Sequence, residues 1–343
     1  MAKIQSHSNA RATVSPEHAV CLCGVSALQY WTHVRQLHNG GPCPELGTSA
    51  SRRTHTRIAS RALAHQLRPR LADTPPAACT APLQALVTSK QAETNTAHVR
   101  ARATTLPLPA GCFTHIAGSL FTSTPEFAFT QMASKLTFAQ LVALGFELCG
   151  TYASDAYGDS TSSVSPLSSA ARLAAFVDRA PGFRHRPLAL RAIPRIIDGS
   201  ASPRETHLTM MLSLPYRHGG YGFPKPALNR TVRLPRSAHS TGGFLVCDLY
   251  WPQWKLDVEY DSNEYHANEE RIGKDAHRRA RLESIGITSI NVSNSQIKSG
   301  EKFNQLAHNL AKVTGKRLRY KDPAFTRAHV KLREELNING LRN

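Results

Sequence analysis

Acidic side chains are scarce in this sequence. Aspartate and glutamate number 24 against 42 lysines and arginines, so the 343 residues carry a formal charge of +18, and the isoelectric point is near 10.0. A surplus of this size favours a polyanionic partner, either nucleic acid or an anionic membrane surface, and of the two we expect nucleic acid. A basic surface with no particular ligand is the alternative that composition leaves open.

Long apolar runs are also lacking. No stretch of 18 or more apolar residues occurs, which argues against a transmembrane helix, and the start MAKIQSHSNARATVS lacks the apolar core of a signal peptide. We therefore expect a cytoplasmic protein with no membrane partner. The seven cysteines are odd in number and scattered, which is typical of reduced thiols rather than of a disulfide framework.

The signals for helices, strands and turns predict an α/β protein. Its C-terminal core has the order α-β-β-β-α-β, and its smaller N-terminal region is mainly helical. The predicted parts are a basic, poorly defined N-terminal region at 1–105, a small α/β unit at 106–155, a linker with a basic helix at 156–198, a domain at 199–322 and a basic tail at 323–343.

The C-terminal domain has the clearest signals. A helix begins where Ser202 caps, Pro203 is the first residue inside and Glu205 completes a capping box. Three strands follow, then a long polar helix from about 267 to 284, a fourth strand and an amphipathic helix; the strands are NRTVRLPR, GFLVCDLYW, KLDVEYD and ITSINV.

Several acidic residues fall close together within this strand pattern. Residues i and i+2 of a strand share a face, so Glu259 and Asp261 point the same way. The turn WPQW predicts a hairpin that brings Asp248 beside Glu259. Converging carboxylates repel each other unless a cation neutralises them, and an all-oxygen site suits Mg²⁺ or Mn²⁺. His266 is placed to act as general acid or base in phosphodiester hydrolysis. The alternative is that these acids lie exposed on a sheet edge.

Residues 199 to about 297 resemble the restriction-endonuclease-like PD-(D/E)xK superfamily, and most of all its very-short-patch-repair endonuclease branch. The resemblance rests on DLYWPQWKLDVEYDSNEYH and RIGKDAHRRARLESIGITSINV. It implies a Mg²⁺-dependent DNA endonuclease of defence or repair. It also implies Asp248 as the principal metal ligand, Glu259 as the second, and Glu205 in a supporting role. The spacing from Asp248 to Asp261 and His266 is similar to that between the repair enzyme's catalytic residues.

One departure concerns the superfamily's lysine. Where the motif has ExK, this chain reads Glu259, Tyr260 and Asp261. We expect His266 to activate the water in its place, with Lys274 as the reserve. The missing lysine also supports a rival interpretation, a catalytically inactive antitoxin-like regulator that only binds DNA. An RNA-processing nuclease is a third possibility, although no aromatic platform for base stacking is evident.

The predicted long helix has a mixed stripe. Arg271, Asp275, Arg278 and Leu282 are spaced by four, three and four residues, so they share one face. A solvated ladder of ion pairs is one interpretation. We favour a stripe that faces the sheet, because Leu282 belongs to it. We expect the nucleic-acid contacts to come from this helix, namely from Arg271, Lys274, Arg278 and Arg279.

The N-terminal part is more faintly similar to AbiEi-type antitoxin-like regulators. The segments that carry this resemblance are GVSALQYW and FTSTPEFAFTQMASKLTFAQLVALGFELCGTY. It implies a small domain, such as a degenerate winged helix, that binds DNA or a partner protein.

Overall fold

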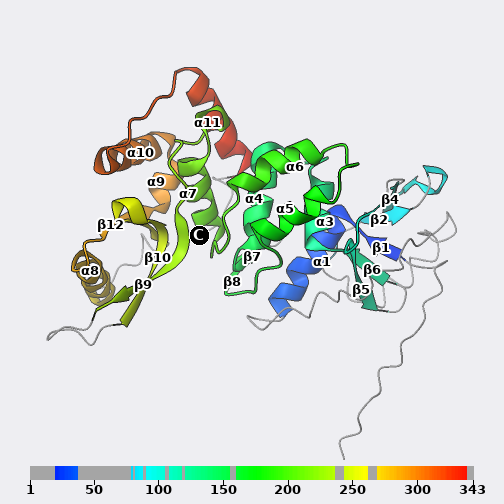
Figure 1. Ribbon diagram of the computed structural model, residues 1–343, viewed down its shortest axis with the longest axis horizontal. Coiled ribbons are helices and arrows are strands. Elements are labelled where there is room, and N and C mark those ends of the chain that lie inside the picture. The colour runs from blue at the N-terminus through cyan, green and yellow to red at the C-terminus, as the bar shows by residue number, and fades with distance from the viewer. Residues whose placement is uncertain are drawn as a thin grey trace, which may run out of the picture.

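A computed structural model describes residues 20–37, 79, 82–87, 90–104, 108–117, 120–154, 160–235, 243–261 and 269–337. It is a mixed α/β structure with a six-stranded sheet, a four-stranded sheet and a two-stranded hairpin. Figure 1 shows the two larger sheets at opposite ends of the molecule, with α4, α5 and α6 between them. Within the described part of the chain, no helix is long and apolar enough to cross a membrane.

The N-terminal half is built on the six-stranded sheet, whose order is β3-β4-β2-β1-β6-β5. Its elements are β1 (Val20–Leu22), α1 (Gly24–Leu37), β2 (Leu83–Val87), β3 (Thr94–Asn95), β4 (Val99–Ala103), β5 (Phe113–Ala117) and β6 (Leu120–Ser123). β1 lies parallel to β6, which is about 100 residues away in sequence. The described residues of this half are therefore not mainly helical as predicted, and one sheet includes strands on both sides of the boundary that we predicted at residue 105.

The strands β1 to β4 of this sheet were missed because they are short, whereas β5 and β6 lie in the unit at 106–155 that we predicted to be α/β. β1 has three residues and β4 reads VRARA, so neither gives enough turns of a period-two pattern to be distinguished from loop. Part of the basic N-terminal region predicted at 1–105, including the segment RIASRALAHQLRPRLA at 57–72, lies outside the described residues.

The next two helices each begin directly after a threonine that caps them. Thr124 caps α3 (Pro125–Met132) and accepts a hydrogen bond from the Phe127 N–H. Thr137 and Gln140 form the capping box of α4 (Phe138–Cys149). Further on lie β7 (Tyr152–Ser154), β8 (Ser160–Ser162), α5 (Ala170–Asp178) and α6 (Arg186–Ala192). The predicted serine-rich linker contributes β8 and packs its Val164 and Leu167 into the interior.

The C-terminal half has the predicted order of elements. They are α7 (Pro203–Ser213), β9 (Ala227–Leu234), β10 (Gly243–Trp251), β11 (Leu256–Asp261), α8 (Glu269–Glu283), β12 (Thr288–Ser293), α9 (Asn294–Lys298), α10 (Gly300–Thr314) and α11 (Ala324–Glu335). The sheet order is β12-β11-β10-β9, with β11 parallel to β12 and the other pairs antiparallel.

The predicted C-terminal tail is an element of this fold up to residue 337. Phe325, His329 and Leu332 of α11 are buried, and the Arg333 guanidinium donates to the carbonyls of Ile297 and Lys298 at 2.8 and 2.6 Å. The guanidinium thereby satisfies carbonyl groups at the end of α9.

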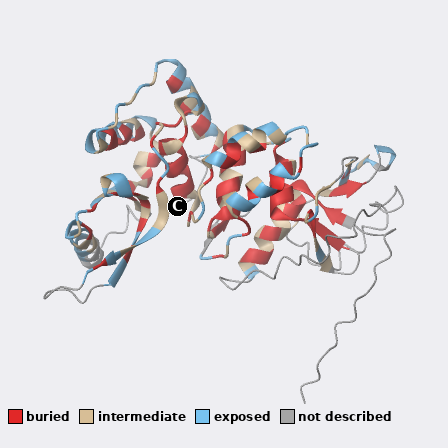
Figure 2. Cartoon of the chain, in the orientation of Figure 1, coloured by how far each residue is buried: buried red, intermediate tan, exposed pale blue. Residues whose placement is uncertain are grey.

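One apolar core joins the middle helices to the C-terminal sheet. It includes Trp31 of α1, Phe146 of α4, Leu208 of α7, Trp251 of β10 and Phe303 of α10. Figure 2 shows the buried residues running continuously through this region. Because fully buried aromatic and leucine side chains each contribute about 1.5–3 kcal/mol, this core holds α7 firmly against the sheet.

A carboxylate cluster as the candidate functional site

Glu205 is held at the start of α7 by four hydrogen bonds. The Ser202 hydroxyl accepts the Glu205 N–H at 3.1 Å and donates to Glu205 Oε1 at 3.0 Å. Glu205 Oε2 accepts from the Ala201 N–H at 2.9 Å and from Asn229 Nδ2 at 2.8 Å. The capping box is thus present in a shifted form, in which the glutamate reaches the N–H of residue 201. Both oxygens of this buried carboxylate are engaged, so its position is fixed.

Asp248 lies on β10, opposite the start of α7. Its Oδ2 accepts the backbone N–H of Tyr260 on β11 at 3.0 Å. Burial, together with the negative charges of Glu205 and Glu259, raises the pKa of Asp248 to about 7, although the Tyr260 N–H and Arg278 act against this shift. Asp248 therefore lies close enough to Glu205 and Glu259 for both charges to act on it.

Glu259 is bound by a cation from the following helix. The Arg278 Nε lies 3.0 and 3.1 Å from the two Glu259 oxygens, and Arg278 Nη2 also contacts Glu259 Oε1 and the Val246 carbonyl oxygen. The pKa of Arg278 is raised, chiefly by the hydrogen bond to Glu259. Arg278 and the fully buried Leu282 both face the sheet, as the helical spacing predicts.

Asp257 is a member of this cluster that the sequence analysis missed. Its side chain is fully buried beside Cys247 and Glu259, and neither carboxylate oxygen has a hydrogen bond of normal geometry within the described structure. Burial and the nearby charges of Glu259 and Asp248 raise its pKa to about 9, so the neutral acid predominates at pH 7. The same i, i+2 rule that placed Glu259 and Asp261 together also includes position 257.

The structure describes only some of the remaining predicted site residues. Asp261 ends β11, half-buried and paired in register with Ser293 of β12. Arg279 is exposed on α8. Arg271 and Lys274 belong to the same helix, but their side chains lie outside the described part, and His266 lies outside it altogether. Their predicted roles remain predictions.

The donor set is chemically suited to a hard divalent cation. Carboxylate oxygens are the ligands that Mg²⁺ and Mn²⁺ prefer, and Mg²⁺ commonly takes only one or two of them together with waters and phosphate oxygens. Among the described residues, no group of three or more His, Cys, Asp or Glu side chains is arranged to hold a metal. The two predicted ligands, Asp248 and Glu259, fit such a cation, provided that it displaces Arg278 from Glu259.

The chain was compared with protein-family models, with curated proteins and with solved structures. None of the three comparisons gave a match.

Proposed function

We propose that this protein is a metal-dependent endonuclease that hydrolyses DNA phosphodiester bonds. The observation that carries the proposal is the mostly buried Asp248 carboxylate, which faces the carboxylates of Glu205 and Glu259 and has a pKa raised to about 7. Burying several carboxylates near one another costs free energy. Such groups are typical of sites in which a bound cation neutralises them. The resemblance to the PD-(D/E)xK superfamily and the element order around Asp248 support the same proposal.

In this proposal Mg²⁺ or Mn²⁺ is held by Asp248 and Glu259. The metal would polarise the scissile phosphate and lower the pKa of a bound water. Glu205 is fixed near Asp248 by Ser202 and Asn229, and a carboxylate in this position favours cation binding. Asp261 and His266 are the proposed groups for activating water and protonating the leaving oxygen.

DNA is the proposed substrate because of the charge of the chain and of α8. The formal charge of +18 favours a polyanion, and the exposed Arg279 projects from the helix that also carries Arg278 beside the cluster. Arginines on this helix could bind backbone phosphates, which position a duplex without reading its sequence.

A second candidate function is the catalytically inactive DNA-binding regulator. The observation that favours it is the Arg278 guanidinium on both oxygens of Glu259, because an internal cation can take over the neutralising role of a metal. In that case the cluster would be structural.

A cleavage assay separates the two functions. Purified wild-type protein is incubated with supercoiled plasmid, linear duplex and single-stranded DNA in Mg²⁺, Mn²⁺ or EDTA. We expect cleavage with metal and none with EDTA. Salt-dependent DNA retention without cleavage under any metal condition would reject the nuclease in favour of the regulator.

Metal binding should depend on pH near neutrality. Since a carboxylate must lose its proton to bind a cation, and the pKa of Asp248 is raised to about 7, protons compete with the metal below that pH. We expect the Mn²⁺ affinity of the DNA-free protein to fall by about tenfold per pH unit below pH 7 and to level off above it. Calorimetric titrations at pH 5.5, 6.5 and 7.5 measure this. An affinity that is constant over that range would show that Asp248 is not a ligand.

A further inference from the structure

A second concave site lies at the other end of the molecule, in the N-terminal half. It is a cavity of about 290 Å³ between the six-stranded sheet, the start of α1, the end of α3 and the loop before α6. Fifteen described residues line it, and none of them is acidic. Arg102, Lys135, Arg184 and His185 are among them, so the lining is cationic. The site is separate from the carboxylate cluster and does not depend on it.

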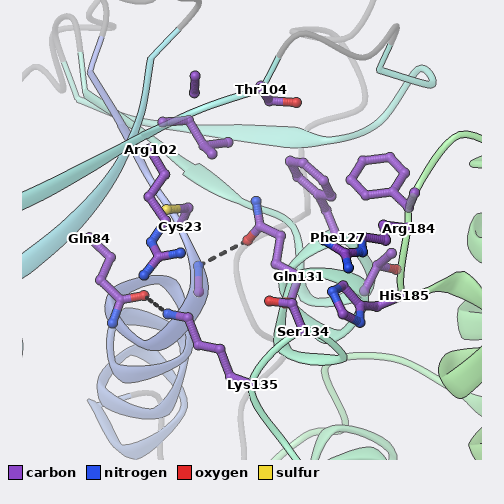
Figure 3. Close-up of a pocket in the computed structure, with 15 residues that line it drawn as sticks. Cys23, Gln84, Arg102, Thr104, Phe127, Gln131, Ser134, Lys135, Arg184 and His185 are labelled. Carbon is purple, nitrogen blue, oxygen red and sulfur yellow. Dashed lines mark hydrogen bonds between the residues drawn. The ribbon is translucent and has the colours of Figure 1, made fainter. Parts of the chain in front are cut away.

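One end of the cavity gathers hydrogen-bond donors. Figure 3 shows Arg102, Gln84 and Lys135 close together beside the first turn of α1. Lys135 Nζ donates to Gln84 Oε1, and the Gly24 N–H of α1 donates to Gln131 Oε1 at 2.9 Å. The Gln131 Nε2 group is buried without a hydrogen-bond partner in the described structure. An acceptor on a ligand would satisfy this donor and lie next to two cations.

The charges at this end are poorly compensated within the described structure. Burial lowers the pKa of Lys135, and the nearby Arg102 and Arg100 lower it further, whereas the Cys23 thiol acts in the opposite direction. Lys135 and Arg102 are both exposed residues, and the repulsion between such neighbouring cations would be offset by a bound anion. The N-terminus of α1, with its positive end of the helix dipole, adds to the same field.

The other end of the cavity is apolar. Phe127 and Phe183 lie there with ring centroids 5.7 Å apart, and Leu86 and Ala103 extend the wall. Figure 3 shows Gln131 between Arg102 and Phe127, so the polar and aromatic ends adjoin. The Cys23 thiol also lines the cavity, but burial raises its pKa to about 12, so it is not a nucleophile at neutral pH. The features favour binding rather than covalent chemistry.

We propose that this cavity binds a nucleoside monophosphate, with its phosphate at Arg102, Lys135 and Gln131 and its base against the half-buried Phe183, which the buried Phe127 supports from behind. Guanidinium and ammonium groups around a helix N-terminus suit a phosphate. An aromatic wall suits a flat base. A cavity of about 290 Å³ lies at the small end of ligand sites, which fits one nucleotide rather than a dinucleotide.

Isothermal titration calorimetry on the full chain tests this proposal, with AMP, CMP, adenosine and inorganic phosphate as probes. We expect AMP or CMP to bind with 1:1 stoichiometry, and adenosine and phosphate to bind at least about tenfold more weakly, because each makes only part of the contacts. Phosphate that binds as tightly as the nucleotides, or nucleotides that give no heat and no thermal stabilisation, would overturn the proposal.

Two variants localise the binding. Arg102→Gln should weaken nucleotide binding by at least about tenfold, the loss of one charge-assisted hydrogen bond. Arg327→Gln is the matched control, because Arg327 is an exposed residue of α11 that does not line the cavity. If the two substitutions weakened nucleotide binding equally, the effect would come from the overall charge of the protein, and the proposed binding site would be wrong. Both positions are exposed, and unchanged circular dichroism and melting temperature confirm that the variants fold.

Discussion

Asp248→Asn should leave plasmid DNA uncut under conditions in which the wild type cuts it, a loss of at least about a hundredfold in rate. The size follows from the behaviour of metal sites, in which altering even a residue outside the ligand shell costs about 10–100-fold. Asparagine keeps the shape of the side chain and one acceptor oxygen. The Tyr260 N–H can therefore still be satisfied, while the negative charge that holds the cation is removed.

The control for this variant is Asp178→Asn. Asp178 ends α5 with a side chain that is 66% exposed, and within the described part of the chain it pairs with Arg186 at 3.4 Å. Its loss changes the net charge by the same amount as the loss of Asp248 does, so any general effect on DNA affinity appears equally in both variants. Cleavage by Asp248→Asn within a few-fold of wild type would place the chemistry elsewhere in the molecule.

Asp257→Asn should stabilise the protein at pH 8 by at least about 1 kcal/mol, measured by urea unfolding in EDTA. The pKa of Asp257 is raised to about 9 in the folded protein, so folding at pH 8 must protonate a carboxyl that is ionised in the unfolded chain, at a cost of about 1.4 kcal/mol for each pH unit above its ordinary pKa. Asparagine needs no proton to stay neutral, and it preserves the volume of the side chain. The gain should be largest at high pH, where the wild-type carboxyl is driven to ionise.

The direction of the pH effect follows from the pKa of Asp257. In the folded protein it is raised to about 9 from an ordinary value of 3.8. The folded state therefore binds a proton more tightly than the unfolded state, so this group's contribution is fully present below about pH 4 and is lost as the pH rises towards 9. The free energy of unfolding of the wild type, minus that of Asp257→Asn, should decrease over this range. A difference that stays constant with pH, with Asp178→Asn as the reference, would contradict the assignment.

Much of the C-terminal half could be predicted because its local signals agree with one another. The strand GFLVCDLYW and the WPQW turn predict β10 and the hairpin to β11, and the Ser202, Pro203 and Glu205 pattern fixes the start of α7. The N-terminal sheet could not be predicted in the same way. Its parallel pairing of β1 with β6 joins segments about 100 residues apart, and short strands such as VCL have no distinctive period.

The site was predictable to the same extent. A hairpin and the period of two bring Asp248 and Glu259 together, and the i, i+4 stripe turns Arg278 towards the sheet. The spacing of residues in the sequence cannot predict which of these charged side chains pairs with which. The Arg278 guanidinium contacts both oxygens of Glu259, whereas neither oxygen of Asp257 has a hydrogen bond of normal geometry within the described structure. That distribution depends on the depth of burial and on the approach of α8, which only the three-dimensional packing determines.

The most direct measurement is a calorimetric titration of Mn²⁺ into metal-free wild-type protein and into Asp248→Asn, at pH 8 and without DNA. The proposed cation site predicts saturable binding to the wild type and binding at least about tenfold weaker to the variant. Identical titration curves, or no binding to either protein, would show that the carboxylate cluster around Asp248 does not hold a metal.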